Sequence, residues 1–173
     1  MKTDALLLPS SIRIFKQYKT LADNAIKQID EAGLHWKPEP ESNSIAIIMK
    51  HMSGNMLSRW SDFLVSDGEK EWRNRDSEFE DEHASSTEII AYWEQGWECL
   101  FSALEPLSND DLAAIVYIRK EAHSVMEAIN RQIAHYAYHV GQIVYLAKAI
   151  KSAEWQTLSI AKGKSQAFND NMK

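Results

Sequence analysis

The sequence predicts an all-α protein whose helices form a four-helix bundle. Three observations predict it: apolar residues recur every three or four positions in four separate stretches, proline, glycine and capping residues separate these stretches, and the chain has 173 residues. A chain of this length buries one sizeable core and is ordinarily one domain. We therefore expect residues 1–173 to form a single helical domain.

The first two helices are expected over about residues 4–30 and 44–66. Gly33 is expected to stop the first helix, and two prolines in "HWKPEPESN" mark the linker that follows. Asn43 or Ser44 is the expected N-cap of the second helix. The second helix carries one apolar stripe with a spacing of three or four. This stripe consists of Ile45, Ile48, Met49, Met52, Met56, Trp60 and Phe63.

A charged segment, residues 67–86, separates the second helix from the third. It is long for a loop and contains Trp72 and Phe79, so we expect it to be ordered and packed on the bundle. Fully extended, it would reach about 66 Å at ~3.3 Å per residue, whereas the second helix is only about 35 Å long. The segment can therefore cross the full length of the bundle and leave the second and third helices parallel.

The third helix is expected to begin after Ser85, Ser86 or Thr87 and to reach about Leu104, where Pro106 ends it. The periodicity directs seven of its apolar residues inward. These are Ile89, Ile90, Trp93, Trp97, Leu100, Phe101 and Leu104.

The last long helix is expected over about residues 124–152, because Ser124 and Glu127 form a capping box. Before it, "AAIVYIRKEAHSV" mixes β-branched and aromatic residues around a charged centre, which predicts a hairpin-like excursion. The C-terminal tail has too little periodicity for a helix. Three apolar residues are expected to anchor this tail: Trp155, Leu158 and Ile160.

Composition and charge narrow the classes of partner and location. The chain has a formal net charge of −6, which argues against nucleic acids and anionic membranes as partners. Apolar stretches are too short to span a bilayer or to serve as a signal peptide. Cys99 is the single cysteine, so no intramolecular disulfide can form, and we expect it to be an inert buried thiol. These features predict a cytoplasmic protein.

Two histidines in "RQIAHYAYHVGQIVYL" have the spacing of metal ligands. His135 and His139 are four residues apart and therefore share one face of a helix. A pair alone is a weak signal, and a third ligand must come from a facing helix. His51 is the only other histidine inside an expected long helix, although it could equally be a histidine at the core boundary.

Three histidines on two helices favour a divalent metal ion, because burying three imidazoles without a ligand would leave polar groups unsatisfied. Three protein ligands leave a coordination position open, as in catalytic zinc sites. Zinc or nickel is expected first, while iron, manganese or copper are alternatives. A di-iron carboxylate site needs two Glu-x-x-His motifs on helices, and only Glu80 and His83 match, in the charged segment.

Further polar residues are candidates for contacts to the ligands or to a substrate. Asn55 and Arg59 follow His51 at one-turn intervals, and Gln142 lies three positions after His139. Each could instead be an ordinary boundary or surface residue. Arg73 and Arg75 could reach an anionic substrate, although a solvated ion-pair loop is the alternative for them.

The chain resembles the DinB-like superfamily of metal-binding helical bundles over nearly its whole length. The resemblance rests on His51 in "KHMSGN", on His135 and His139 in "HYAYHVGQIVYL", and on "VYIRKEAHSV" before the last helix. The long stretch from "SIAIIMKHMSGN" to "RNRDSEFED" and the ending "LSIAKGKSQAFN" resemble one branch of the superfamily that has no assigned substrate.

The resemblance implies an up-down-down-up four-helix bundle, a divalent metal on the three histidines, a cytosolic bacterial protein and, frequently, a homodimer. Because the superfamily includes bacillithiol S-transferases and mycothiol-dependent enzymes, it also implies transfer of a low-molecular-weight thiol or a related metal-assisted reaction. A fold does not fix a function. A metal-dependent transferase or hydrolase, a non-catalytic metal-binding or stress-related dimer, and a purely structural bundle therefore stay open.

Overall fold

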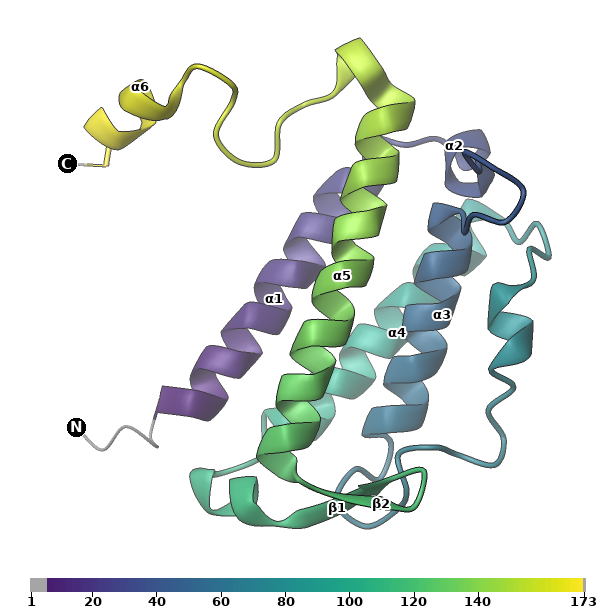
Figure 1. Ribbon diagram of the computed structural model, residues 1–173, viewed down its shortest axis with the longest axis vertical. Helices are drawn as coiled ribbons and strands as arrows, with labels where there is room; N and C mark the ends of the chain where they lie inside the picture. The colour runs from purple at the N-terminus through teal and green to yellow at the C-terminus, as the bar shows by residue number, and fades with distance from the viewer. Residues whose placement is uncertain (1–5, 173) are drawn as a thin grey trace.

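The computed structural model describes residues 6–172, and four long helices dominate it (Figure 1). They are α1 (Leu7–Ile26), α3 (Ile45–Trp60), α4 (Ser86–Leu104) and α5 (Val125–Lys151). Two short helices, α2 (Glu31–His35) and α6 (Ser165–Asp170), and a hairpin of β1 (Ile115–Ile118) and β2 (Glu121–Ser124) complete the regular elements together with three 3₁₀ turns. The turns are Asp76–Phe79, Asn109–Ala113 and Ser152–Glu154. The predicted all-α class is confirmed.

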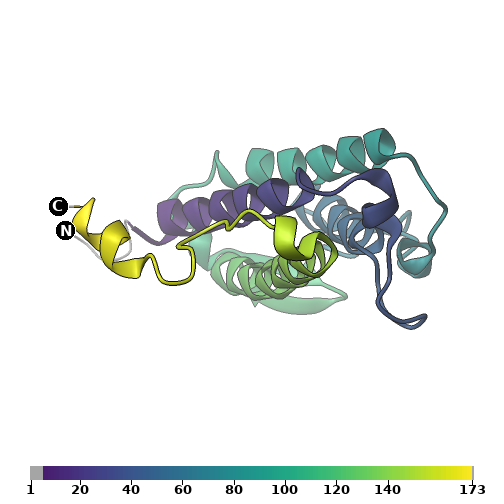
Figure 2. The same ribbon diagram turned by 90° about the horizontal axis from the view of Figure 1, so that it is seen from above.

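The long helices lie side by side with α1 packed on α5 and α3 packed on α4. In Figure 1, α1 and α5 run upward along the chain, whereas α3 and α4 both run downward. The segment between α3 and α4, which we call the crossover (residues 61–85), therefore returns along the outer side of α3 (Figures 1 and 2). As predicted, this segment is ordered, and its 3₁₀ turn contacts α3.

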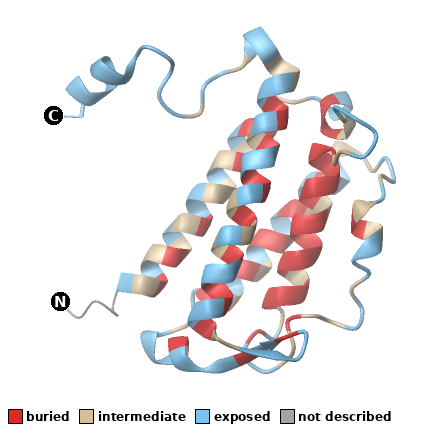
Figure 3. Ribbon diagram, viewed as in Figure 1, coloured by how far each residue is buried: buried red, intermediate tan, exposed pale blue. Residues whose placement is uncertain are grey.

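Helix α3 is buried on nearly every side (Figure 3), which corrects the prediction of one apolar stripe. Fourteen of its 16 residues are buried, including His51, Asn55 and Arg59. The physical reason is that α4 covers one side while the crossover covers another. Polar side chains on α3 are consequently held inside the protein, where each requires a partner or a ligand.

Aromatic side chains from all four long helices form the centre of the core. The ring of Tyr136 lies 5.8 Å from that of Phe15 and 5.9 Å from that of Trp97, centroid to centroid. Trp60 Nε1 donates to the Tyr136 hydroxyl at 3.2 Å, and this hydroxyl donates to Asn55 Oδ1 at 3.0 Å. The polar groups of Trp60, Tyr136 and Asn55 thus satisfy one another, and this chain of bonds fixes α5 against α3, whereas Trp97 Nε1 is buried without a partner among residues 6–172.

Two helix ends differ from the predictions. Helix α1 ends at Ile26, and Gly33 lies inside α2, where its backbone N–H donates to the Asp30 cap at 2.8 Å, so Gly33 does not stop a helix. Helix α3 begins after the predicted cap Ser44 but ends at Trp60, well before residue 66, and Asp62 has a positive φ of 49°. Local turn geometry ended these helices earlier than the apolar spacing indicated.

The predicted caps and the predicted hairpin are confirmed. Ser85 with Glu88 and Ser124 with Glu127 form capping boxes at the starts of α4 and α5. The β1–β2 turn has two positive φ values, at Arg119 and Lys120, as two-residue hairpin turns require. Short local sequence signals therefore determined these features.

Three predictions about apolar residues and the tail were wrong. Ile90 is 42% exposed, because it lies at the edge of the inward face of α4. The tail contains the short helix α6, and Ile160 is 40% exposed, so it does not anchor the tail. Trp155 and Leu158 do pack against the core as predicted.

The close approach of α3 and α4 generates a test of the packing. A Cβ at Gly96 would lie 2.9 Å from the backbone Cα of Ser53, so we expect Gly96→Ala to lower the free energy of unfolding by about 1–3 kcal/mol. Urea denaturation monitored by tryptophan fluorescence would measure this. The matched control is Gly141→Ala in α5, where a Cβ meets no atom within 4 Å; it should raise the free energy of unfolding by about 0.5–1 kcal/mol. Equal effects at the two positions would contradict the packing described.

Candidate metal centre

Three histidines from two helices converge between α3 and α5. His51 comes from α3, and His135 and His139 come from successive turns of α5. One ring nitrogen of each lies within 4.8 Å of the others, and the ring centroids are 4.8–5.5 Å apart. His51 and His139 are buried and His135 is half-buried. The three residues predicted from spacing therefore form one group that could hold a metal ion.

The crossover fixes the orientation of His51. His51 Nδ1 lies 2.9 Å from Glu78 Oε2, and both side chains are buried. Because an ionised carboxylate only accepts hydrogen bonds, Nδ1 carries a proton, and Nε2 is the ring nitrogen left for a ligand. Arg73 donates to both Glu78 oxygens, at 2.7 Å and 2.9 Å. Although burial acts to raise the pKa of Glu78, the bonds from His51 and Arg73 lower it below its ordinary value, so Glu78 stays ionised.

A glycine allows Glu78 to come this close to α3. A Cβ at Gly54 would lie 2.3 Å from Glu78 Oε1. Gly54 is three residues after His51, on the turn that the crossover covers. The absence of a side chain there lets the carboxylate reach His51.

The α5 histidines are held in the neutral form that binds metals. His139 Nδ1 lies 2.9 Å from Gln142 Oε1, so Nδ1 donates and Nε2 is left with a lone pair. Burial, together with the neighbouring histidines, lowers the pKa of His135 to about 3. Burial also lowers the pKa of His139 to about 4, although the bond to Gln142 acts in the opposite direction. Neutral imidazole is the ligand form for divalent metals.

The donor set fits a divalent transition metal. Within residues 6–172, His139 Nε2 is a buried nitrogen with no hydrogen-bond partner. Such an atom is costly unless a ligand satisfies it. In His51 and His139, the Nδ1–H group also donates a hydrogen bond to an oxygen atom, as the second ring nitrogen of metal-binding histidines ordinarily does. The residues thus fit the group that the sequence predicted.

The sequence did not predict a role for Glu78, and it predicted the wrong environment for Arg73. Glu78 was not singled out, because its partner His51 is 27 residues away and only the return of the crossover joins them. The Arg73 side chain is 3% exposed and binds Glu78, so it belongs neither to a solvated loop nor to a surface that binds substrate directly. The sequence offered one signal for their role: a carboxylate and an arginine lie close to an aromatic residue, Phe79, in the charged segment.

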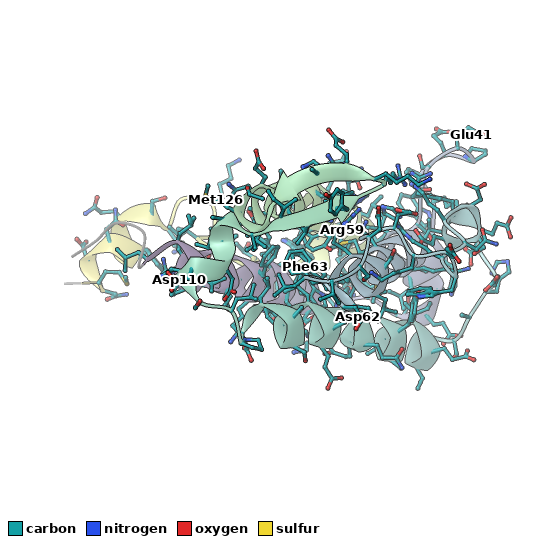
Figure 4. All side chains as sticks on the ribbon, turned by 90° about the horizontal axis from the view of Figure 1, so that it is seen from below. Glu41, Arg59, Asp62, Phe63, Asp110 and Met126 are labelled. Carbon is teal, nitrogen blue, oxygen red and sulfur yellow. The ribbon has the colours of Figure 1, made fainter. Side chains whose placement is uncertain are left out.

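The three candidate polar residues occupy different positions around the histidines. Gln142 is exposed and orients His139, whereas Asn55 is buried and accepts from Tyr136. Arg59 is buried at the hairpin end of the bundle, beside the β1–β2 hairpin (Figure 4). Asn55, Arg59 and two of the histidines line a common cleft of about 440 Å³.

The other histidines and the cysteine contribute no ligand to this group. His35 lies in α2 rather than in a linker, and both of its ring nitrogens bond to oxygens, of Asp81 at 2.9 Å and of Ala84 at 3.0 Å. His123 lies on β2, within the predicted hairpin. Burial raises the pKa of the half-buried Cys99 thiol above its ordinary value, which fits the inert thiol predicted.

Comparison with known proteins identifies one family. The family described as "Protein of unknown function (DUF1572)" matches residues 3–164, which is nearly the whole chain. No curated protein matches the chain. In the part of the chain that the structure describes, no helix is both long enough and apolar enough to cross a membrane.

The low pKa values of the α5 histidines predict a pH dependence of the metal-free protein. Unfolded histidines titrate near 6.5, whereas His135 and His139 titrate at about 3 and about 4 in the folded state. Below pH 6.5 the unfolded chain therefore binds more protons, and the free energy of unfolding falls as the pH drops toward 4. We expect a loss of about 1 kcal/mol per pH unit after discounting the partial exposure of His135.

Denaturation of EDTA-treated protein between pH 7 and pH 5 would measure this dependence. His139→Gln should reduce the slope, whereas the control His83→Gln, at a side chain that is 82% exposed, should leave it unchanged. A free energy of unfolding that does not change with pH would show that the histidines are not buried as described.

The bond between Gln142 and His139 generates a second prediction. Gln142→Leu removes the acceptor for His139 Nδ1 at an exposed position, so the metal affinity should fall about 10–100-fold while the stability of the metal-free protein stays the same. Competition with a fluorescent zinc chelator would measure the affinity. The matched control is Gln17→Leu, at an exposed site on α1. Equal zinc affinity in the two variants would remove Gln142 from the site.

Proposed function

We propose for this chain, which belongs to the DUF1572 family, a metal-dependent reaction of the thiol S-transferase or hydrolase type on a small molecule. One observation carries the proposal. Three histidines from α3 and α5 converge, and the Nε2 atom of His139 has no partner among residues 6–172. A divalent ion is the ligand that satisfies all three.

We also propose that the fold is the up-down-down-up four-helix bundle of the DinB-like superfamily, formed by residues 1–173 as one domain. The directions of the four long helices (Figure 1) support this proposal, as does the long crossover between α3 and α4. The ligands come from the two helices, α3 and α5, that face each other across the interior.

The chemistry follows from the donor set. A divalent ion, zinc or nickel first and iron or manganese as alternatives, would supply a Lewis acid that lowers the pKa of a thiol or a water at the open position. His51 and His139 hold their Nε2 atoms in place, because Glu78 and Gln142 accept from their Nδ1 atoms. His135 completes the set from the preceding turn of α5.

The cleft beside the histidines suits a small-molecule substrate. Its volume of about 440 Å³ lies within the range of small-ligand sites. His51 and His135 line it, so a molecule in the cleft reaches the proposed open position directly. Asn55 and Arg59 line the same space and are available for polar contacts to the substrate. A low-molecular-weight thiol is the substrate class that we propose.

A non-catalytic metal-binding dimer is the alternative function. The proposal of a homodimer draws on large apolar side chains that are exposed on α5 and on the tail, such as Tyr145, Phe168 and Met172. The tail extends away from the helices (Figure 2), where a second copy could cover it. A cytoplasmic location, favoured by the single cysteine, stays a prediction.

Elemental analysis of protein purified without an affinity tag tests the metal site. We expect about one zinc or nickel ion per chain, and we expect His51→Ala, His135→Ala and His139→Ala each to lose the bound ion. His123→Ala is the matched control, because His123 lies on β2 and belongs to neither group of side chains that could hold a metal ion, the three histidines or His35, Asp81 and His83. Protein that holds almost no metal, even after incubation with zinc and nickel salts, would contradict the proposal.

Activity assays then separate the reaction types. The metal-loaded protein should conjugate a small thiol to an electrophile such as monobromobimane, or hydrolyse a small ester or amide, and EDTA should abolish the reaction. Stoichiometric metal without turnover of any of these substrates would instead support the non-catalytic alternative.

A further inference from the structure

Arg59 is a buried cation without a counter-ion. The residue as a whole is 4% exposed. Its Nε and Nη1 atoms are buried and have no hydrogen-bond partner in the described part of the chain. Arg73 offers the contrast, since it is equally enclosed but binds both oxygens of Glu78. Two neighbouring arginines thus differ in that only one has its charge satisfied.

The surroundings increase the demand for an anion at Arg59. Burial lowers the pKa of Arg59 below its ordinary value. Tyr136 and Glu69 act against this effect and Arg131 and Arg73 act with it, and the guanidinium stays protonated at neutral pH. An unpaired buried charge is among the most unfavourable features of a protein interior. A negatively charged ligand in the cleft that Arg59 lines would compensate the charge of this guanidinium.

The cleft that Arg59 lines is rich in cations. Its lining includes five arginines and no carboxylate. They are Arg59, Arg73, Arg75, Arg119 and Arg131. Glu78 and Glu69 bind Arg73, and Glu69 also binds Arg119, which leaves three arginines without an ion pair among residues 6–172. This concentration of positive charge occurs in a chain whose net charge is −6.

The position of Arg59 is fixed by the loop that follows α3. A Cβ at Gly68 would lie 2.5 Å from Arg59 Nη1, so the guanidinium packs directly on this glycine. The Gly68 backbone is itself held by Ser58, whose hydroxyl donates to the Gly68 carbonyl at 3.0 Å, and by the Tyr117 carbonyl, which accepts from the Gly68 N–H at 2.8 Å. The guanidinium is therefore preorganised rather than free to turn toward solvent.

We propose that this cleft is an oxyanion subsite in which Arg59, Arg75 and Arg131 bind a carboxylate or phosphate group of the substrate. The inference rests on the proposed function, because His51 and His135 line the same cleft and would place the reacting group of that molecule at the metal. The substrate is accordingly a small molecule with an oxyanion at one end and a metal-binding group, such as a thiol, at the other. Planar guanidinium groups suit both oxyanions.

Calorimetric titration of the full-length protein tests the subsite without requiring activity. Inorganic phosphate and succinate are titrated separately, at constant ionic strength set with chloride, into protein as purified and after EDTA treatment. We expect at least one of the two anions to bind in both preparations, and the stronger binder identifies the oxyanion class. Arg59→Met and Arg131→Gln should each weaken binding about tenfold or more.

The matched control is Arg13→Gln, an exposed arginine on α1 outside the cleft, which changes the net charge equally and should bind the anion as the wild-type protein does. Thermal melting checks the folded state: phosphate or succinate should raise the melting temperature of the wild-type protein but not that of Arg59→Met. Arg131→Gln changes an exposed residue, so its binding result does not depend on the tolerance of the buried position.

Two results would overturn the subsite: no binding of either anion to the wild-type protein, or equal weakening in all three variants. The proposed function fails separately. If the protein binds phosphate but never holds metal, the subsite is supported and the proposed metal-dependent reaction is contradicted. If the metal-loaded protein binds neither anion, the metal site is supported and the subsite is contradicted.

Discussion

The buried chain of groups from Arg73 through Glu78 to His51 joins the crossover to α3. Three polar groups are removed from water there, and each is tolerated because the next one satisfies it. The arrangement requires Gly54 on α3, because a larger side chain would displace the carboxylate. It also explains how α3 can be buried on nearly all sides while carrying His51.

The same helix separates two electrostatic environments. On the side of Glu78, the cationic and anionic groups are balanced, so the histidine tautomer is fixed and the carboxylate is ionised. On the side of Arg59, positive charge is left uncompensated next to the histidine group. An acidic protein that keeps a cationic cleft attracts small anions to one place while repelling them elsewhere on its surface.

Local signals made much of the fold predictable, whereas tertiary contacts determined the rest. The capping box at Ser124 predicted the start of α5 correctly, since its partner Glu127 lies three residues away, and Ser85 was one of the three candidate starts of α4. The three metal-ligand candidates were predicted from spacing on two helices, and the structure brings them together. Glu78 could not be predicted in this way, because its role depends on how residues 61–85 return along α3. The single apolar stripe expected on α3 was wrong for the same reason.

The group of three histidines also has a consequence for the synthesis of the chain. His51 leaves the ribosome 84 residues before His135 and 88 before His139, by the difference of their positions in the sequence. Helix α3 can therefore pack on α4 early, but its contact with α5 forms only when nearly the whole chain has been translated. The complete group of three histidines exists only after synthesis of α5, so an ion held by all three would couple its loading to the last step of folding.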